Sequence, residues 1–168
     1  MKLSPKGQKW LKAVHLLFVC LWVCGGISLI LMGYGLPPEE GGELYGIDRT
    51  IKFIDDLIIV PGAMGCLLTG ILYGSLTNWG FFKHKWIIVK WVETVGGIVF
   101  GTFYLGEWLN TLAPLSKEMG LAALEDPAYI ENKNLNLHWS LVQVATLILA
   151  VFLSTLKPWK AKAKKPSA

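Results

Sequence analysis

Four stretches of the chain are apolar over most of their length, and this feature limits the fold more than any other. A helix needs about 20 mainly apolar residues to cross a hydrocarbon core of about 30 Å. In lipid, backbone polar groups must be satisfied within the protein, and a helix satisfies its own. A soluble protein can bury one such run, but hardly four within 168 residues.

We therefore predict an all-α fold, a four-helix transmembrane bundle that forms one integral membrane domain over residues 1–168. The hydrophobic fraction of 53% is also too high for an ordinary soluble protein. The predicted spans are Ala13–Tyr34, Ile51–Leu76, Trp86–Asn110 and Leu137–Leu156.

The distribution of basic residues predicts the orientation of the bundle. Eleven of the 16 Lys and Arg residues lie before the first span, between the second and third spans, or after the fourth. Because Lys and Arg favour the cytoplasmic side, we expect both termini in the cytoplasm. The net charge of +4 then faces lipid headgroups, so the bilayer and not a nucleic acid is the expected partner.

The third connection, Thr111–Asn136, is longer than an unstructured loop of a compact protein should be. Its segment "PLSKEMGLAALEDPAYI" has apolar residues at helical spacing. We therefore expect a short amphipathic helix in this outer connection, lying over the outer surface.

Polar residues at membrane depth are costly, which makes them candidates for function. His15 and Lys90 lie about one turn inside the basic ends of the first and third spans, so they should sit at similar depth. Trp22 and Gly26 share the helical stripe of His15, and Glu93 follows Lys90 on nearly the same face. His15 is either a ligand for a cofactor or an interfacial histidine, and the sequence leaves both open.

A second polar group is expected near the outer surface. It consists of Asp55, Asp56, Glu107 and His138. Carboxylates and an imidazole at one level can hold a divalent metal or pass protons. The alternative is that these side chains are interfacial and contact water and nearby cations.

Three motifs carry a resemblance to a known family. "WLKAVH" in the first span, "PGAMGCLLTGILY" in the second and "KWIIVK" in the third resemble the HemJ family of bacterial membrane proteins. The resemblance implies a small helical bundle that binds haem b and oxidises protoporphyrinogen. It also implies that His15 takes the place of the haem-ligating histidine and Lys90 that of a third-helix lysine.

Two functions follow as hypotheses. In the first, the chain is a haem b-binding redox protein, an oxidoreductase that exchanges electrons with quinone or oxidises a porphyrin precursor, with His15, Lys90, Trp22 and Gly26 around the haem. In the second, it is a non-catalytic membrane anchor or accessory subunit, which binds a membrane-complex partner or further copies of itself.

Overall fold

The computed structural model describes residues 2–157. Within that range the chain forms four long helices and no strand, which confirms the predicted all-α four-helix bundle. Each long helix has the length and hydropathy of a membrane span. In chain order the elements are α1 (Pro5–Gly35); α2 (Gly41–Ile54), η1 (Asp55–Ile59) and α3 (Val60–Leu76); α4 (Lys85–Phe100), η2 (Gly101–Leu105), α5 (Gly106–Met119) and η3 (Gly120–Glu125); and α6 (Pro127–Leu156).

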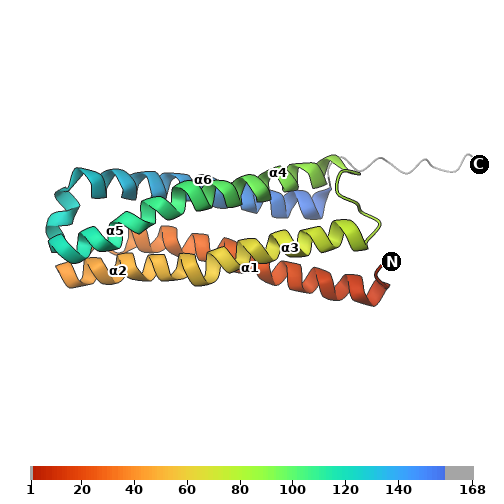
Figure 1. Ribbon diagram of the computed structural model, residues 1–168, viewed down its shortest axis with the longest axis horizontal. Coiled ribbons are helices and arrows are strands. Elements are labelled where there is room, and N and C mark those ends of the chain that lie inside the picture. The colour runs from red at the N-terminus through yellow and green to blue at the C-terminus, as the bar shows by residue number, and fades with distance from the viewer. Residues whose placement is uncertain (1, 158–168) are drawn as a thin grey trace, which may run out of the picture.

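The bundle is elongated, and both the start of α1 and the end of α6 lie at the same end of it (Figure 1). We call one the basic end, where α1 begins, α3 is joined to α4 by residues 77–84, and α6 ends. We call the other the acidic end, where residues 36–40 join α1 to α2 and η3 joins α5 to α6. Because the helices alternate in direction, residues distant in sequence meet at each end.

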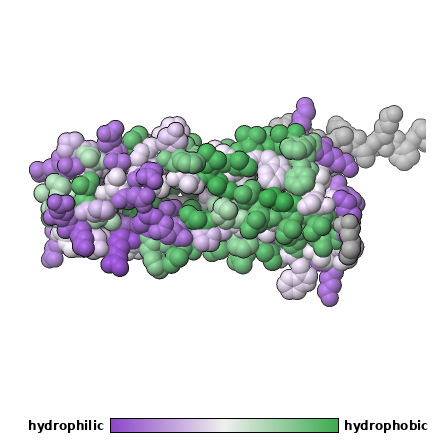
Figure 2. All heavy atoms as spheres, in the orientation of Figure 1, coloured by the Kyte–Doolittle hydropathy of each residue, from purple (hydrophilic) through white to green (hydrophobic). Residues whose placement is uncertain are grey.

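Apolar side chains cover the half of the surface toward the basic end, whereas hydrophilic side chains dominate the half toward the acidic end (Figure 2). The second long helix has 36 residues, which corresponds to about 54 Å at 1.5 Å per residue. This length exceeds a hydrocarbon core of about 30 Å. The bundle is therefore long enough to extend beyond the membrane, and its hydrophilic half is the part suited to do so.

The acidic half has a core of its own. Leu44 of α2, Leu112 of α5 and Tyr129 of α6 are buried together in one cluster with Leu29 of α1. Most polar residues of these helices face outward, because only one side of each helix contacts this core, whereas Asp48, Ser116 and Asn136 are buried. The acidic half is thus a packed part of the bundle and not a set of loops.

This extension corrects the predicted boundaries. The second long helix begins at Gly41 and not at Ile51, and the third continues to Met119 instead of ending at Asn110. The residues expected to form a separate amphipathic helix are indeed helical and amphipathic, but they prolong the spans rather than lie across the surface. Hydropathy marks only the apolar part of a helix. It therefore did not show that the amphipathic residues continue the same helices beyond the apolar spans.

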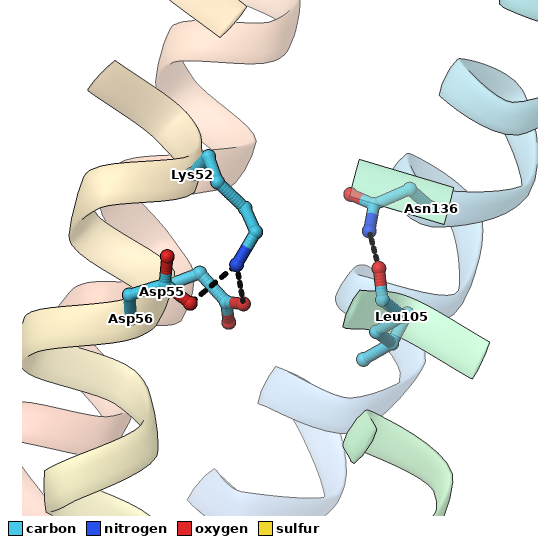
Figure 3. Close-up of polar contacts among 5 residues, drawn as sticks. All are labelled: Lys52, Asp55, Asp56, Leu105 and Asn136. Carbon is cyan, nitrogen blue, oxygen red and sulfur yellow. Dashed lines mark hydrogen bonds and ion pairs between the residues drawn. The ribbon is translucent and has the colours of Figure 1, made fainter. Parts of the chain in front are cut away.

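Two π-helical segments, η1 and η2, interrupt the second and third long helices without breaking them. Such segments free a backbone carbonyl from its usual partner in the helix. At η2, the side-chain amide of Asn136 donates a hydrogen bond of 3.0 Å to the carbonyl of Leu105 (Figure 3). Asn136 is 4% exposed, so α6 supplies a buried donor where the irregular helix needs one.

The first prediction concerns the core of the acidic half. The hydroxyl of Tyr129 donates to the carboxylate of Asp48, with distances of 3.1 and 3.2 Å to its two oxygens, and Asp48 is 4% exposed. Tyr129→Phe leaves the buried carboxylate without this donor, so it should lower the free energy of unfolding by about 1–3 kcal/mol. Thermal unfolding in detergent, followed by circular dichroism, measures the loss.

The matched control is Tyr34→Phe, because Tyr34 is 57% exposed near the end of α1. This variant should unfold at the wild-type temperature. Equal unfolding temperatures for the two variants would contradict a stabilising role of the bond between Tyr129 and Asp48.

Candidate functional site

A cavity of about 540 Å³ lies within the bundle toward its basic end. Its walls come from α1, α3, α4 and α6, and the connection of residues 77–84 contributes to it. Ligand sites in proteins typically have volumes of about 300–1,000 Å³. The cavity is therefore large enough for a small organic ligand or cofactor.

The cavity exists because α4 stands apart from α1 and α3, which pack closely together. A Cβ atom at Gly62 of α3 would lie only 2.8 Å from the backbone nitrogen of Trp22 on α1. In contrast, Ile87 is the only buried residue of α4. Small residues such as Gly70 and Ala150 leave room on the facing walls.

His15 lies in the wall of this cavity and is held by a buried residue of the next helix. Its Nδ1 atom is 2.7 Å from the hydroxyl oxygen of Thr69, which is 5% exposed. The His15 ring also contacts Tyr73 edge-to-face, with a centroid distance of 6.3 Å. These contacts from α3 determine how the imidazole is oriented.

The Thr69 hydroxyl indicates which ring nitrogen of His15 carries the proton. It donates to a carbonyl of its own helix, that of Gly65 or Cys66. A hydroxyl has one proton, so when Thr69 donates it to that carbonyl, the oxygen accepts its hydrogen bond from Nδ1–H of His15. The Nε2 atom of neutral His15 is then unprotonated, with a lone pair available for a ligand. Metal-binding histidines are commonly oriented in this way, by a hydrogen bond from the other ring nitrogen.

The structure brings together three of the four residues predicted to surround a cofactor. His15, Trp22 and Lys90 all line the cavity. Gly26 does not, because it is buried where α1 meets α6, and a Cβ atom there would lie 2.7 Å from Val144. Gly26 shares the stripe of His15 but lies just under one turn beyond Val23, where the cavity wall ends on this helix, so it serves helix packing.

Two buried polar atoms in the cavity wall have no hydrogen-bond partner among the described residues. They are Oε1 of Glu93 and Nε1 of Trp86, both on α4. Buried polar groups in proteins are nearly always paired, and leaving one unpaired costs about 1–3 kcal/mol. Both atoms are shielded from the cavity, so a ligand would pair with them only after these side chains rotate toward it.

The sequence did not single out the aromatic residues at the basic end of the cavity. Trp79 and Trp86 line it, and Nζ of Lys157 lies 4.5 Å from the centroid of the Trp79 ring. His84 stacks on Trp86 with a centroid distance of 6.1 Å but does not line the cavity. The only signal in the sequence was the frequency of tryptophan around the second connection.

The residues of the predicted outer site lie apart. Asp55 and Asp56 both pair with Lys52, and the distance from Lys52 Nζ to Asp55 Oδ2 is 3.9 Å (Figure 3). Glu107 is exposed, and exposed His138 has its Nδ1 atom 2.6 Å from the carbonyl oxygen of Asn134 in its own helix. Within residues 2–157, no three His, Cys, Asp or Glu side chains are grouped to hold a metal ion.

The structure therefore does not assemble Asp55, Glu107 and His138 into a metal site. Residues at one level of a bundle can face different directions, and depth alone cannot reveal this. Comparison with known proteins provides no relative, because no family model, curated protein or solved structure matches the chain significantly.

The second prediction tests the protonation of His15. In protein labelled with ¹⁵N in the histidine rings, the His15 signals should report a protonated Nδ1 and an unprotonated Nε2. Thr69→Val removes the acceptor with little change in shape, so it should shift these signals toward the other tautomer.

Thr146→Val is the control, because the Thr146 hydroxyl is exposed and bonds only within its own helix. It should leave the His15 signals unchanged. A wild-type His15 that carries its proton on Nε2 would contradict the assignment.

Proposed function

We propose that this chain is a haem b-binding redox protein of the membrane, with His15 as an axial ligand of the haem iron. The observation that carries the proposal is the hydrogen bond between His15 and Thr69. With Nδ1 protonated, this bond leaves the Nε2 lone pair of a cavity-lining histidine free to bind iron. Haem iron accepts histidine nitrogen, and bundle cores commonly hold such cofactors.

The remaining residues of the cavity are compatible with haem. Its walls are mainly apolar, as the face of a porphyrin requires, and Val19, Val23 and Leu147 contribute to them. Lys90 comes from the opposite helix and provides a second nitrogen in the same cavity. Bound haem supplies one-electron redox chemistry, while these residues bind it, orient it and exclude water.

The resemblance of "WLKAVH" and "KWIIVK" to the HemJ family supports the same function, since both His15 and Lys90 line the cavity. On this proposal the protein works in a bacterial inner membrane. Its redox partner is a lipid-soluble molecule, either a quinone or a porphyrin precursor that is oxidised. Such molecules reach the protein from within the bilayer, where the apolar half of its surface lies.

The second candidate is a non-catalytic anchor or accessory subunit of a larger membrane complex. The hydrophilic half of the bundle supports it, because this half provides a folded surface at the acidic end on which a partner subunit or a second copy could assemble (Figure 2). The two functions differ in one measurable property, the visible absorption of the purified protein.

The third prediction is that the protein purified in detergent, after expression with ample haem, shows a Soret band. His15→Ala should remove this band, because the imidazole is the proposed iron ligand. His138→Ala should retain it, because His138 is exposed and bonds to its own helix. A colourless wild-type protein, or an unchanged band in His15→Ala, would contradict the proposal.

A second pair of variants tests the location of the haem. Gly70 lines the cavity, and the nearest atom to a Cβ there would be in Trp91 at 3.8 Å. Gly70→Leu should therefore fill part of the cavity and reduce the haem content. At exposed Gly96 of α4 a Cβ would meet nothing within 4 Å, so Gly96→Leu should keep the wild-type content.

The fourth prediction concerns orientation. We propose that the basic end faces the cytoplasm, since Lys and Arg accumulate on that side of membrane proteins. Reporters fused to the C-terminus or inserted at residues 78–83 should report the cytoplasm, and a reporter inserted at residues 36–40 should report the opposite side. A C-terminal reporter on the far side would reverse the assignment.

A further inference from the structure

The polar groups of the cavity are distributed unevenly between its two ends. Lys12, Lys157 and the indole N–H of Trp86 lie toward the basic end. Glu93 lies on the same helix as Trp86 but seven residues further from that end, about 10 Å along the axis. At the basic end, which we call the mouth, the charged groups are cations, whereas deeper in the cavity Lys90 and the carboxyl group of Glu93 lie three residues apart on one helix.

The groups at the mouth lack anionic partners in the described part of the chain. The ion pairs within residues 2–157 involve Lys52, far from this cavity, and neither Lys12 nor Lys157 has a carboxylate within 4.0 Å. Lys157 lies against aromatic rings, with its Nζ 4.5 Å from the Trp79 centroid and 5.8 Å from that of Trp86. Trp86 Nε1 is buried and has no acceptor.

We propose that the cavity binds an amphiphile with a carboxylate, and that Trp86, Lys157 and Lys12 hold this carboxylate at the basic end. An anion at this position would neutralise two cations, and a rotation of the Trp86 ring would bring the unpaired indole N–H to it. Such charge-assisted bonds are among the strongest in proteins. The apolar body then extends toward His15. The reverse orientation would place the carboxylate beside Glu93, whose own carboxyl group offsets the charge of Lys90, whereas the mouth presents Lys12 and Lys157 without a carboxylate among the described residues.

This inference rests on the proposed function to the extent that haem b is such a molecule, with two propionates on an apolar ring. A free fatty acid has the same chemistry, an apolar body with one carboxylate. Haem b and a fatty acid would place a carboxylate at the same position in the mouth of the cavity. Only haem b would also require His15 for binding. The experiment therefore compares each acid with its own neutral ester.

The fifth prediction compares haem b with haem b dimethyl ester, and palmitate with methyl palmitate, on the ligand-free wild-type protein in detergent. Soret titration follows the haems, and isothermal titration calorimetry follows the fatty acids. At least one acid should bind about tenfold or more tightly than its ester, because the ester cannot form the charge-assisted bonds. In Trp86→Phe and Lys157→Gln, this preference should fall toward equal binding.

The controls are Trp10→Phe and Lys9→Gln, which change the same residue types on the exposed part of α1 outside the cavity. Both should keep the wild-type preference for the acid. Lys157→Arg keeps the positive charge and should retain most of the preference for the acid. If Lys157→Gln loses this preference and Lys157→Arg does not, the loss results from the missing charge and not from misfolding.

The outcomes separate the two proposals. If neither haem b nor palmitate binds the wild-type protein more tightly than its ester, and the Soret band depends on His15, the carboxylate site is overturned and the haem function is supported. Acid-dependent binding of palmitate without haem binding supports the carboxylate site and overturns the haem function. An acid preference that persists unchanged in Trp86→Phe and Lys157→Gln overturns the assignment of these residues.

Discussion

The close contact between α1 and α3 positions the candidate site. Gly62 brings the backbone of α3 against Trp22, and Gly65 faces the ring of Phe18 so closely that a larger residue would collide with it. At this separation Thr69 reaches His15 across the helix interface. Without a hydrophobic force between helices in lipid, such contacts between small residues and well-packed side chains hold the spans together.

The cavity forms because α4 does not pack against α1 and α3 as closely as these two helices pack against each other. Most of α4 is exposed or only partly buried, and its polar side chains at Trp86, Lys90 and Glu93 face a space that the chain itself leaves open. The cavity has a volume of about 540 Å³ and is open to the surroundings of the bundle, so a ligand could enter it without unfolding the helices. The cavity and the unpaired polar atoms of Trp86 and Glu93 occur in the same part of the bundle, and the proposal of a bound ligand rests on both.

Much of the fold could be predicted from the sequence because the apolar runs are long and a helix in lipid is nearly the only option. The common depth of His15 and Lys90 followed from their distance to the basic segments, and both do line one cavity. The role of Gly26 could not be predicted. Its position on the same helical face as His15 does not reveal whether a side chain of α6 fills the space beside Gly26. Thr69 and Trp86 were not identified, because a threonine or a tryptophan in a span is ordinary until its partner, or the lack of one, is seen.

The two halves of the bundle treat buried polar groups in opposite ways. In the acidic half, the buried carboxylate of Asp48 accepts hydrogen bonds from Tyr129, and buried Asn136 donates to a carbonyl that an irregular helix has freed. In the basic half, Glu93 and Trp86 each keep an unpaired atom although lipid makes such an atom more costly there. In the hydrophilic half, water could replace a missing hydrogen-bond partner, yet these buried polar groups are paired within the chain. In the apolar half water cannot do so, and an unpaired polar group there is harder to explain. The difference is understandable if the partner in the basic half is a bound ligand.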